Sequence, residues 1–149
     1  MYLYRAIAQG NFIGSDYAGT IAVGNGRGVF IEEATLGGTT AAARNIISGN
    51  KGYGVFAIRG GNVIQGNYIG TDITGRIAMG NSGGGGIYVV LGQNVLIGGT
   101  SLGAGNVVAS NGYREIYVAG STGPVVIQGN YIGVNVTGNL PMGIPSFGA

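Results

Sequence analysis

Two aspartates occupy the same place in a phrase that the chain repeats, and they are its best candidates for acid–base chemistry. "QGNFIGSDYAG" spans residues 9–19 and "QGNYIGTDITG" spans residues 65–75, so Asp16 and Asp72 are equivalent. If the two copies lie two strands apart in a regular stack, the carboxylates are roughly 9.6 Å apart. This separation is at the upper edge of the roughly 6.5 to 9.5 Å between the acid and the base of an inverting glycosidase. The spacing therefore leaves a carbohydrate-active enzyme open as one function.

The third copy of the phrase favours a structural role for these aspartates. In "QGNYIGVNVTG", residues 128–138, the aspartate is replaced by Asn135, which does not titrate. All three copies place Asx first and Gly fourth in a four-residue stretch, as a type I turn prefers, and either Asx side chain accepts hydrogen bonds from nearby backbone N–H groups. We therefore interpret Asp16 and Asp72 as turn residues and predict no catalytic residue, with this pair as the alternative.

Other catalytic and metal chemistry has little support. The chain contains no His and no Cys, so Ser-His-Asp and Cys-His mechanisms and thiolate metal sites are excluded within it. Calcium needs six to eight oxygen ligands, and the sequence has no dense carboxylate cluster, which leaves a calcium site at Asp16 and Asp72 as a minor alternative. We expect no metal and no cofactor.

Composition indicates short strands joined by many turns. The chain has 34 Gly, 45% apolar residues and 8% charged residues. Many of the apolar residues are Ile, Val, Tyr and Phe, the β-branched and aromatic types that suit a sheet. Seven basic and five acidic residues are thinly spread, so no basic patch favours nucleic-acid binding. No run approaches the ~18 apolar residues of a membrane span.

Three sets of repeats predict the architecture. Besides the "QGN[FY]IG" phrase, "LGGTTAAARNIISGN" at 36–50 returns as "IGGTSLGAGNVVASN" at 97–111, and a short strand recurs as "GVFI" at 28, "GVFAI" at 54, "GIYV" at 86 and "EIYV" at 115. Periods of this length are typical of solenoids. We predict an all-β, right-handed parallel β-helix of about five rungs in one domain, residues 1–149. The predicted rungs are 26–50, 51–81, 82–111 and 112 to about 144, preceded by half a rung in 1–25.

Two columns of side chains are expected along this stack. An asparagine follows an aliphatic strand in each rung and predicts an amide ladder formed by Asn11, Asn50, Asn67, Asn111 and Asn130. In the repeated first strand, alternation places Val29 and Ile31 and their equivalents inside. The residues between them point outward and predict an aromatic column that stabilises the stack or binds a protein or a glycan: Phe30, Phe56, Tyr88 and Tyr117.

The phrases "NVIQGNYIGTDITG", "GGTTAAARNIISGN" and "GNSGGGGIYV" resemble the repeats of right-handed parallel β-helix proteins, especially the long arrays of large bacterial secreted or surface proteins. The resemblance covers nearly the whole chain. It implies an extracellular or cell-surface location. Neither terminus shows a capping helix or a charged cover, so we expect the chain to be an excerpt of a longer array or to associate end to end. The resemblance does not settle function, because the same solenoid carries lyases, hydrolases and adhesins.

We predict a non-catalytic structural or binding module, a scaffold or adhesin-like segment. The alternative is a polysaccharide lyase or glycoside hydrolase of β-helix type. Expected partners are a polysaccharide or another protein, with end-to-end association of copies of the chain as a further possibility, since solenoid ends present unpaired strand edges. No nucleic acid and no membrane span are expected.

Overall fold

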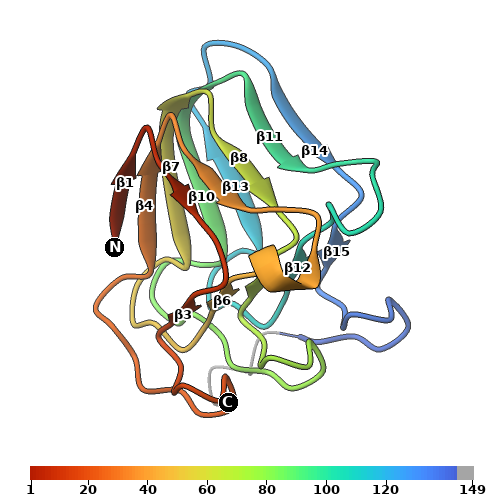
Figure 1. Cartoon of the computed structure of the whole chain (residues 1–149). Coiled ribbons are helices and arrows are strands. Elements are labelled where there is room, and N and C mark those ends of the chain that lie inside the picture. The colour runs from red at the N-terminus through yellow and green to blue at the C-terminus, as the bar shows by residue number, and fades with distance from the viewer. Residues whose placement is uncertain (144–149) are drawn as a thin grey trace.

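The protein is a stack of rungs, each built from three short parallel strands. The structure is a computed structural model and describes residues 1–143. Three five-stranded parallel sheets run the length of the stack, and each rung contributes one strand to each sheet (Figure 1). The predicted all-β parallel β-helix of about five rungs is therefore confirmed. Among the described residues the only helix is a single 3₁₀ turn, η1 (Ala41–Ala43).

We name the sheets A, B and C in the order in which the chain visits them. Sheet A contains β1 (Tyr2–Tyr4), β4 (Val29–Glu32), β7 (Val55–Gly60), β10 (Ile87–Gln93) and β13 (Ile116–Ala119). Sheet B contains β2 (Ile7–Ala8), β5 (Thr35–Gly37), β8 (Val63–Gln65), β11 (Val95–Gly98) and β14 (Val125–Gln128). Sheet C contains β3 (Phe12–Ile13), β6 (Ile46–Ile47), β9 (Tyr68–Ile69), β12 (Val107–Val108) and β15 (Tyr131–Ile132). Rungs are numbered along the chain, so rung one holds β1, β2 and β3.

The first rung differs from its prediction. Residues 1–25 were expected to form half a rung, but they contain a strand of each sheet, and Tyr2 pairs with Phe30 of the next rung. The strand Tyr2–Tyr4 is not preceded by the glycine that marks most of its equivalents, so the pattern does not reveal it. Rungs two to five follow the predicted boundaries, and the predicted end at residue 144 lies outside the described residues.

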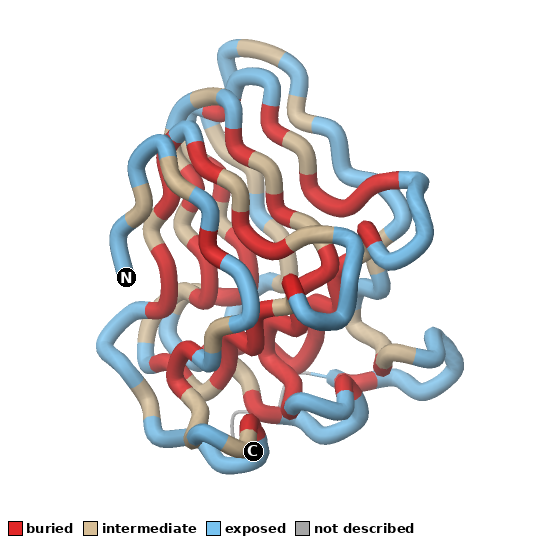
Figure 2. Tube along the Cα trace, viewed as in Figure 1, coloured by how far each residue is buried: buried red, intermediate tan, exposed pale blue. Residues whose placement is uncertain are grey.

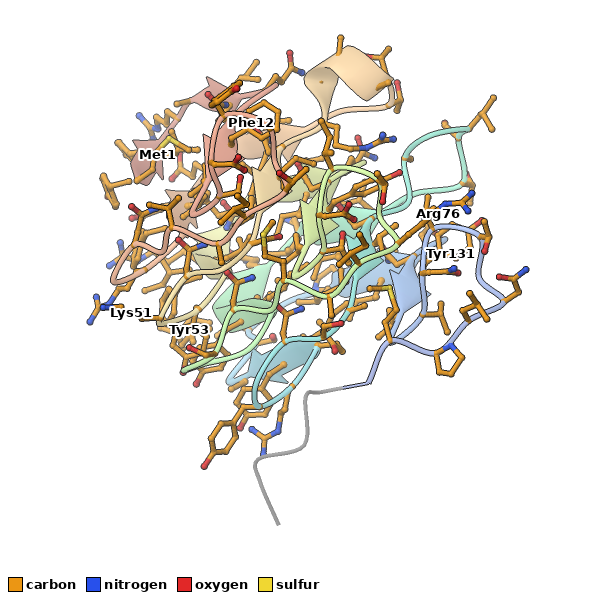
Figure 3. All side chains as sticks on the ribbon, turned by 90° about the horizontal axis from the view of Figure 1, so that it is seen from below. Met1, Phe12, Lys51, Tyr53, Arg76 and Tyr131 are labelled. Atoms are coloured by element: carbon orange, nitrogen blue, oxygen red, sulfur yellow. The ribbon has the colours of Figure 1, made fainter. Side chains whose placement is uncertain are left out.

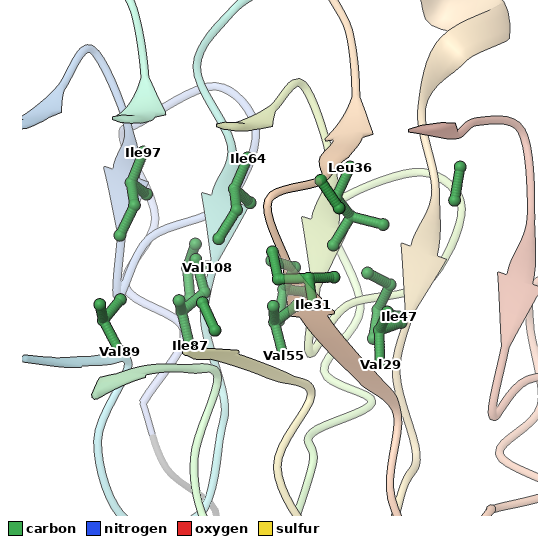
Figure 4. Packing of buried hydrophobic residues seen from close by; sticks show 14 of the residues in the cluster. Val29, Ile31, Leu36, Ile47, Val55, Ile64, Ile87, Val89, Ile97 and Val108 are labelled. Atoms are coloured by element: carbon green, nitrogen blue, oxygen red, sulfur yellow. The ribbon is translucent and has the colours of Figure 1, made fainter. Parts of the chain in front are cut away.

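Inward-pointing aliphatic side chains fill the centre of the stack (Figure 4), and the buried positions recur along its strands (Figure 2). The alternation predicted for sheet A is confirmed, because its inward residues in rungs two to four are at most 2% exposed: Val29, Ile31, Val55, Ala57, Ile87 and Val89. Sheets B and C each add further aliphatic residues, and full burial of one such side chain stabilises the fold by about 1.5–3 kcal/mol.

The sequence pattern merged two strands that the structure separates. The aliphatic strand that was expected before the asparagine of each rung corresponds to two different strands. Ile64 and Ile127 lie in sheet B, whereas Ile47 and Val108 lie in sheet C. The merger arose because a three-residue step to Asn follows the sheet B strand in rungs one, three and five and the sheet C strand in rungs two and four, which makes the two corners look alike in sequence.

Long loops alternate between two corners of the stack, and this explains why the longest repeats recur about every 60 residues. Rungs one and three carry a long loop between sheet C and the next sheet A strand, rung five carries the equivalent loop after β15, and these loops contact one another directly. The N–H of Ile73 donates to the Gly19 carbonyl at 2.9 Å, and the N–H of Val136 donates to the Gly75 carbonyl at 3.0 Å. Each loop therefore fills the height of two rungs, so adjacent rungs cannot both carry one.

Rungs two and four carry their long loop at the other corner, between sheets B and C, at residues 38–44 and 99–105. The "GGT" phrase begins this loop because the chain passes very close to its neighbour. Gly98 has φ +86, and a Cβ atom there would lie 2.1 Å from the Gln128 carbonyl oxygen. Only glycine combines this backbone conformation with this approach.

Candidate functional site

Asparagines form a hydrogen-bonded ladder at the corner between sheets B and C. In each step the backbone N–H and Nδ2 of one asparagine donate to Oδ1 of the next, as Asn45 does to Asn67 at 3.2 and 2.9 Å. Nδ2 of Asn67 also donates to the Leu36 carbonyl at 2.9 Å. The inner members are completely buried, so these bonds replace water. The members, one from each rung, are Asn11, Asn45, Asn67, Asn106 and Asn130.

A second ladder runs along the corner between sheets C and A. It consists of Asn25, Asn50, Asn81 and Asn111, joined by the same pattern of bonds. A carboxylate ends it, since Asn111 donates from Nδ2 to Oε2 of Glu115 at 2.6 Å and from its backbone N–H to Oε1 at 3.2 Å. Burial raises the pKa of Glu115, and the hydrogen bonds from Asn111 oppose this rise.

The structure divides the five asparagines of the sequence interpretation between these ladders. Three belong to the first ladder and two to the second. The other four members, Asn25, Asn45, Asn81 and Asn106, were missed. The signal that could have found them is present in the repeats, where "RN" and "GN" precede aliphatic strands as well as follow them.

The four aromatic residues proposed as a binding surface lie in one column on the outer face of sheet A. Neighbouring rings along the column are centred 4.9 to 5.2 Å apart. Phe30 and Phe56 are stacked at 16°, and Tyr88 and Tyr117 at 15°, whereas Phe56 meets Tyr88 edge-on at 85°. Stacked rings face one another and present mainly edges to solvent. A sugar binds through its C–H face to an open ring face, so most of the column is poorly suited to glycan binding.

Two further aromatic residues extend this column. Tyr2 lies 5.1 Å from Phe30, and Tyr53 stacks on Tyr88 at 5.0 Å while it meets Phe56 at 63°. Together with Arg27, the residues Tyr2, Phe30, Tyr53 and Phe56 line a cavity of about 460 Å³ at the first three rungs. Tyr2 is 62% exposed, and its ring is the most accessible one of the column.

Asp16 and Asp72 each close their own loop. Oδ1 of Asp72 accepts hydrogen bonds from the backbone N–H groups of Arg76 and Ile77 at 3.1 and 3.0 Å, and the Thr74 hydroxyl donates to Oδ2 at 2.8 Å. Oδ1 of Asp16 accepts the equivalent pair of backbone N–H groups at 2.8 and 2.9 Å. Oδ1 of Asn135 accepts from the N–H of Leu140 at 3.4 Å, so the amide does the same work.

The electrostatics of these loops do not favour acid catalysis. Hydrogen bonds from the backbone N–H groups of Ile21 and Thr20 lower the pKa of Asp16. Burial acts to raise the pKa of Asp72, but its hydrogen bonds from Ile77, Thr74 and Arg76 together lower it. Since a general acid must hold a proton near neutral pH, two carboxylates with lowered pKa values make a poor acid–base pair.

The three remaining acidic residues are also paired within the structure. Glu32 forms an ion pair with Arg59 at 2.5 Å, and Glu33 forms one with Arg5 at 2.6 Å. Glu115 caps the second ladder. All five acidic residues of the chain therefore have a partner. No group of three His, Cys, Asp or Glu side chains that could hold a metal ion occurs in the described part of the chain.

Sequence reasoning also missed a contact on the outer face of sheet C. The guanidinium carbon of Arg44 lies 4.1 Å from the centre of the Tyr68 ring. The two residues are 24 positions apart and belong to adjacent rungs, so only the stacking register brings them together.

A scan against protein-family models finds no match, and searches of curated proteins and of solved structures also find none. The parallel β-solenoid fold therefore rests on the strand pairing itself. No helix in residues 1–143 is both long and apolar enough to cross a membrane.

Proposed function

We propose that this chain is a non-catalytic scaffold module, a segment of parallel β-solenoid that holds its outer surfaces in a fixed register. One observation carries the proposal. The repeated polar residues, which are the natural candidates for a site, are used by the stack itself, because the asparagines bond to one another and every carboxylate has a partner in the fold. A catalytic acid or base would need a group left available for a substrate.

The aromatic column is part of this scaffold. Its rings pack at the rung spacing, and each aromatic pair contributes about 0.5 to 1.5 kcal/mol beyond the area that it buries. The rings present mainly their edges to solvent, which supports stacking within the protein as the main role of the column. A protein contact ranks second and glycan binding third. The exposed ring of Tyr2 and the adjoining cavity are the part of the column best suited to a ligand.

Location and family are further parts of the proposal. The resemblance of the repeats to those of right-handed parallel β-helix arrays supports a bacterial secreted or surface protein. Core positions of rung five are exposed, with Ile127 at 41% and Ile132 at 47%, although their equivalents Ile97 and Val108 are completely buried. Such exposed apolar edges favour pairing with a further rung.

Assays for turnover and for binding test the function. The chain is incubated with acidic and neutral polysaccharides, and reducing ends and unsaturated products are measured. We expect no product above that of a heat-treated sample. Product formation that is lost in Asp72→Asn would refute the proposal and establish the enzyme. Retention on a glycan array without turnover would instead support a binding module for carbohydrate.

A further inference from the structure

The contact between Arg44 and Tyr68 has a vacant counterpart two rungs further along the stack. Nε of Arg44 donates to the Gly66 carbonyl at 3.1 Å, and its guanidinium lies over the Tyr68 ring. This cover, together with neighbouring loops, leaves Tyr68 only 6% exposed. A planar cation over an aromatic ring is a favourable arrangement, and arginine is the residue that most often provides it.

The repeats show which residues form the counterpart. "GGTTAAARN" at 37–45 aligns with "GGTSLGAGN" at 98–106, which places Gly105 at the position of Arg44. "QGNYIG" at 65–70 aligns with the same phrase at 128–133, which places Tyr131 at the position of Tyr68 and Gly129 at that of Gly66. The second site therefore keeps the ring and the carbonyl group but lacks the arginine.

The structure leaves the space of the missing guanidinium open. Tyr131 is 43% exposed and lines a cleft of about 550 Å³ together with Gly105 and Gly129, and this cleft extends to Arg44 and Tyr68 of the first site. Tyr131 lies in the last rung, far along the stack from Phe12 (Figure 3). The Gly129 carbonyl accepts no hydrogen bond from residues 1–143.

No arginine of the described chain fills this space. The guanidinium groups that lie over tyrosine rings within residues 1–143 are those of Arg5, Arg44 and Arg114, and their rings are Tyr4, Tyr68 and Tyr117. Residue 105 cannot supply a side chain either, because a Cβ atom on Gly105 would lie 2.0 Å from the Gly129 carbonyl oxygen. A guanidinium over Tyr131 would therefore have to come from another molecule.

We propose that this cleft binds an arginine side chain of a partner protein, stacked on Tyr131 and donating a hydrogen bond to the Gly129 carbonyl. The contact between Arg44 and Tyr68 supports this chemistry, because the same fold there places an arginine over the equivalent ring. Arg44 lines the same cleft, but its guanidinium is held over Tyr68 by the bond to the Gly66 carbonyl. Equivalent positions two rungs apart are roughly 9.6 Å apart, about one Debye length at physiological salt, so salt weakens the repulsion between the two cations. An arginine can bind in this cleft whether or not the chain has catalytic activity.

Binding is tested by NMR with ¹⁵N-labelled protein and N-acetyl-arginine methylamide. We expect saturable shifts at the amides of Gly105, Gly129 and Tyr131. The neutral isostere N-acetyl-citrulline methylamide keeps the shape but loses the charge, so it should bind roughly fivefold more weakly or not measurably. Equal shifts with both compounds, or no saturable shift, would refute the proposal. Larger saturable shifts with a neutral pyranose would refute it in favour of a carbohydrate site.

Variants separate a stacked site from non-specific binding. Tyr131→Leu should abolish the shifts, whereas Tyr131→Phe, which keeps the ring, should retain them. Arg44→Ala empties the first site, so the arginine compound should now also shift the amides of Tyr68 and Gly66. Failure of Arg44→Ala to create this second site, in a variant with an otherwise native spectrum, would count against the inference, because the two sites share one chemistry.

Discussion

Removing one inner asparagine from the first ladder should destabilise the fold strongly. The Asn67 side chain takes part in four hydrogen bonds. Oδ1 accepts from the backbone N–H and Nδ2 of Asn45, and Nδ2 donates to the Leu36 carbonyl and to Oδ1 of Asn106. Asn67→Ala deletes all four in a completely buried position. At about 1 kcal/mol for each net bond, the loss is about 4 kcal/mol, and the unpaired N–H and carbonyl groups that remain can raise it.

The matched control is Asn130, which occupies the same position in rung five. Its side chain also takes part in four bonds, but the residue lies at the end of the ladder and is half-buried, so water can replace several of them. We expect Asn130→Ala to lose at most about 1.5 kcal/mol.

Urea unfolding followed by far-UV circular dichroism measures both variants against the unchanged chain. Since small domains are stable by about 5–15 kcal/mol, Asn67→Ala should shift the midpoint far toward low urea. A loss no greater than that of Asn130→Ala would refute the reasoning, because it would show that burial does not decide what a ladder bond contributes.

Three further changes test the loops, the aromatic column and one strained position. Asp72→Asn should lower stability at pH 7 by at most about 1 kcal/mol, because an amide oxygen accepts the same backbone bonds. The pKa of Asp72 is lowered on folding, so its contribution is present above the ordinary value of 3.8 and is lost as the pH falls. Urea midpoints should therefore depend less on pH in acid in this variant, and an unchanged dependence would contradict the assignment. Replacing both Tyr88 and Tyr117 by Ser should lower the unfolding free energy by about 2–4 kcal/mol, whereas unchanged stability with loss of ligand binding would show that the column is a binding surface. Ser110 has φ +64 and a buried hydroxyl without a hydrogen-bond partner among residues 1–143, where the equivalent Gly49 has φ +77. Ser110→Gly should therefore raise stability by about 1 kcal/mol in the same assay, and a lower midpoint would contradict this.

Internal repetition made the fold predictable from this one chain. Residues that recur at a fixed period must occupy equivalent positions, so three copies of a phrase serve as an alignment of the chain with itself. Alternation in "GVFI" and "GIYV" then identified which side chains point inward. The prediction was least accurate where two corners of the rung use the same residue type, which is why one asparagine ladder was predicted and two exist.

Contacts between different phrases were not predictable in the same way. Arg44 lies in the "GGT" phrase and Tyr68 in the "QGN" phrase, and their contact depends on how far one rung is shifted relative to the next. A repeat shows which positions are equivalent, but it does not show which non-equivalent positions come into contact between rungs. The same limit concealed the pairing of Glu115 with Asn111, because a carboxylate that ends a ladder has no counterpart in the other rungs.

The alternation of loops divides the outer surface into two kinds of face. Sheet A presents one outward residue of the same type in every rung, so its surface repeats at the strand spacing of ~4.8 Å. Sheet C is flanked by loops that each fill two rungs, so its surface repeats at roughly twice that distance. The short period lets neighbouring rings touch and therefore favours stacking within the protein. The longer period keeps Tyr68 and Tyr131 apart and leaves room between loops for a side chain, supplied by Arg44 in one case and open in the other. A partner that binds along the axis should therefore contact sheet C at Tyr131, whose ring is exposed, rather than the stacked rings of sheet A.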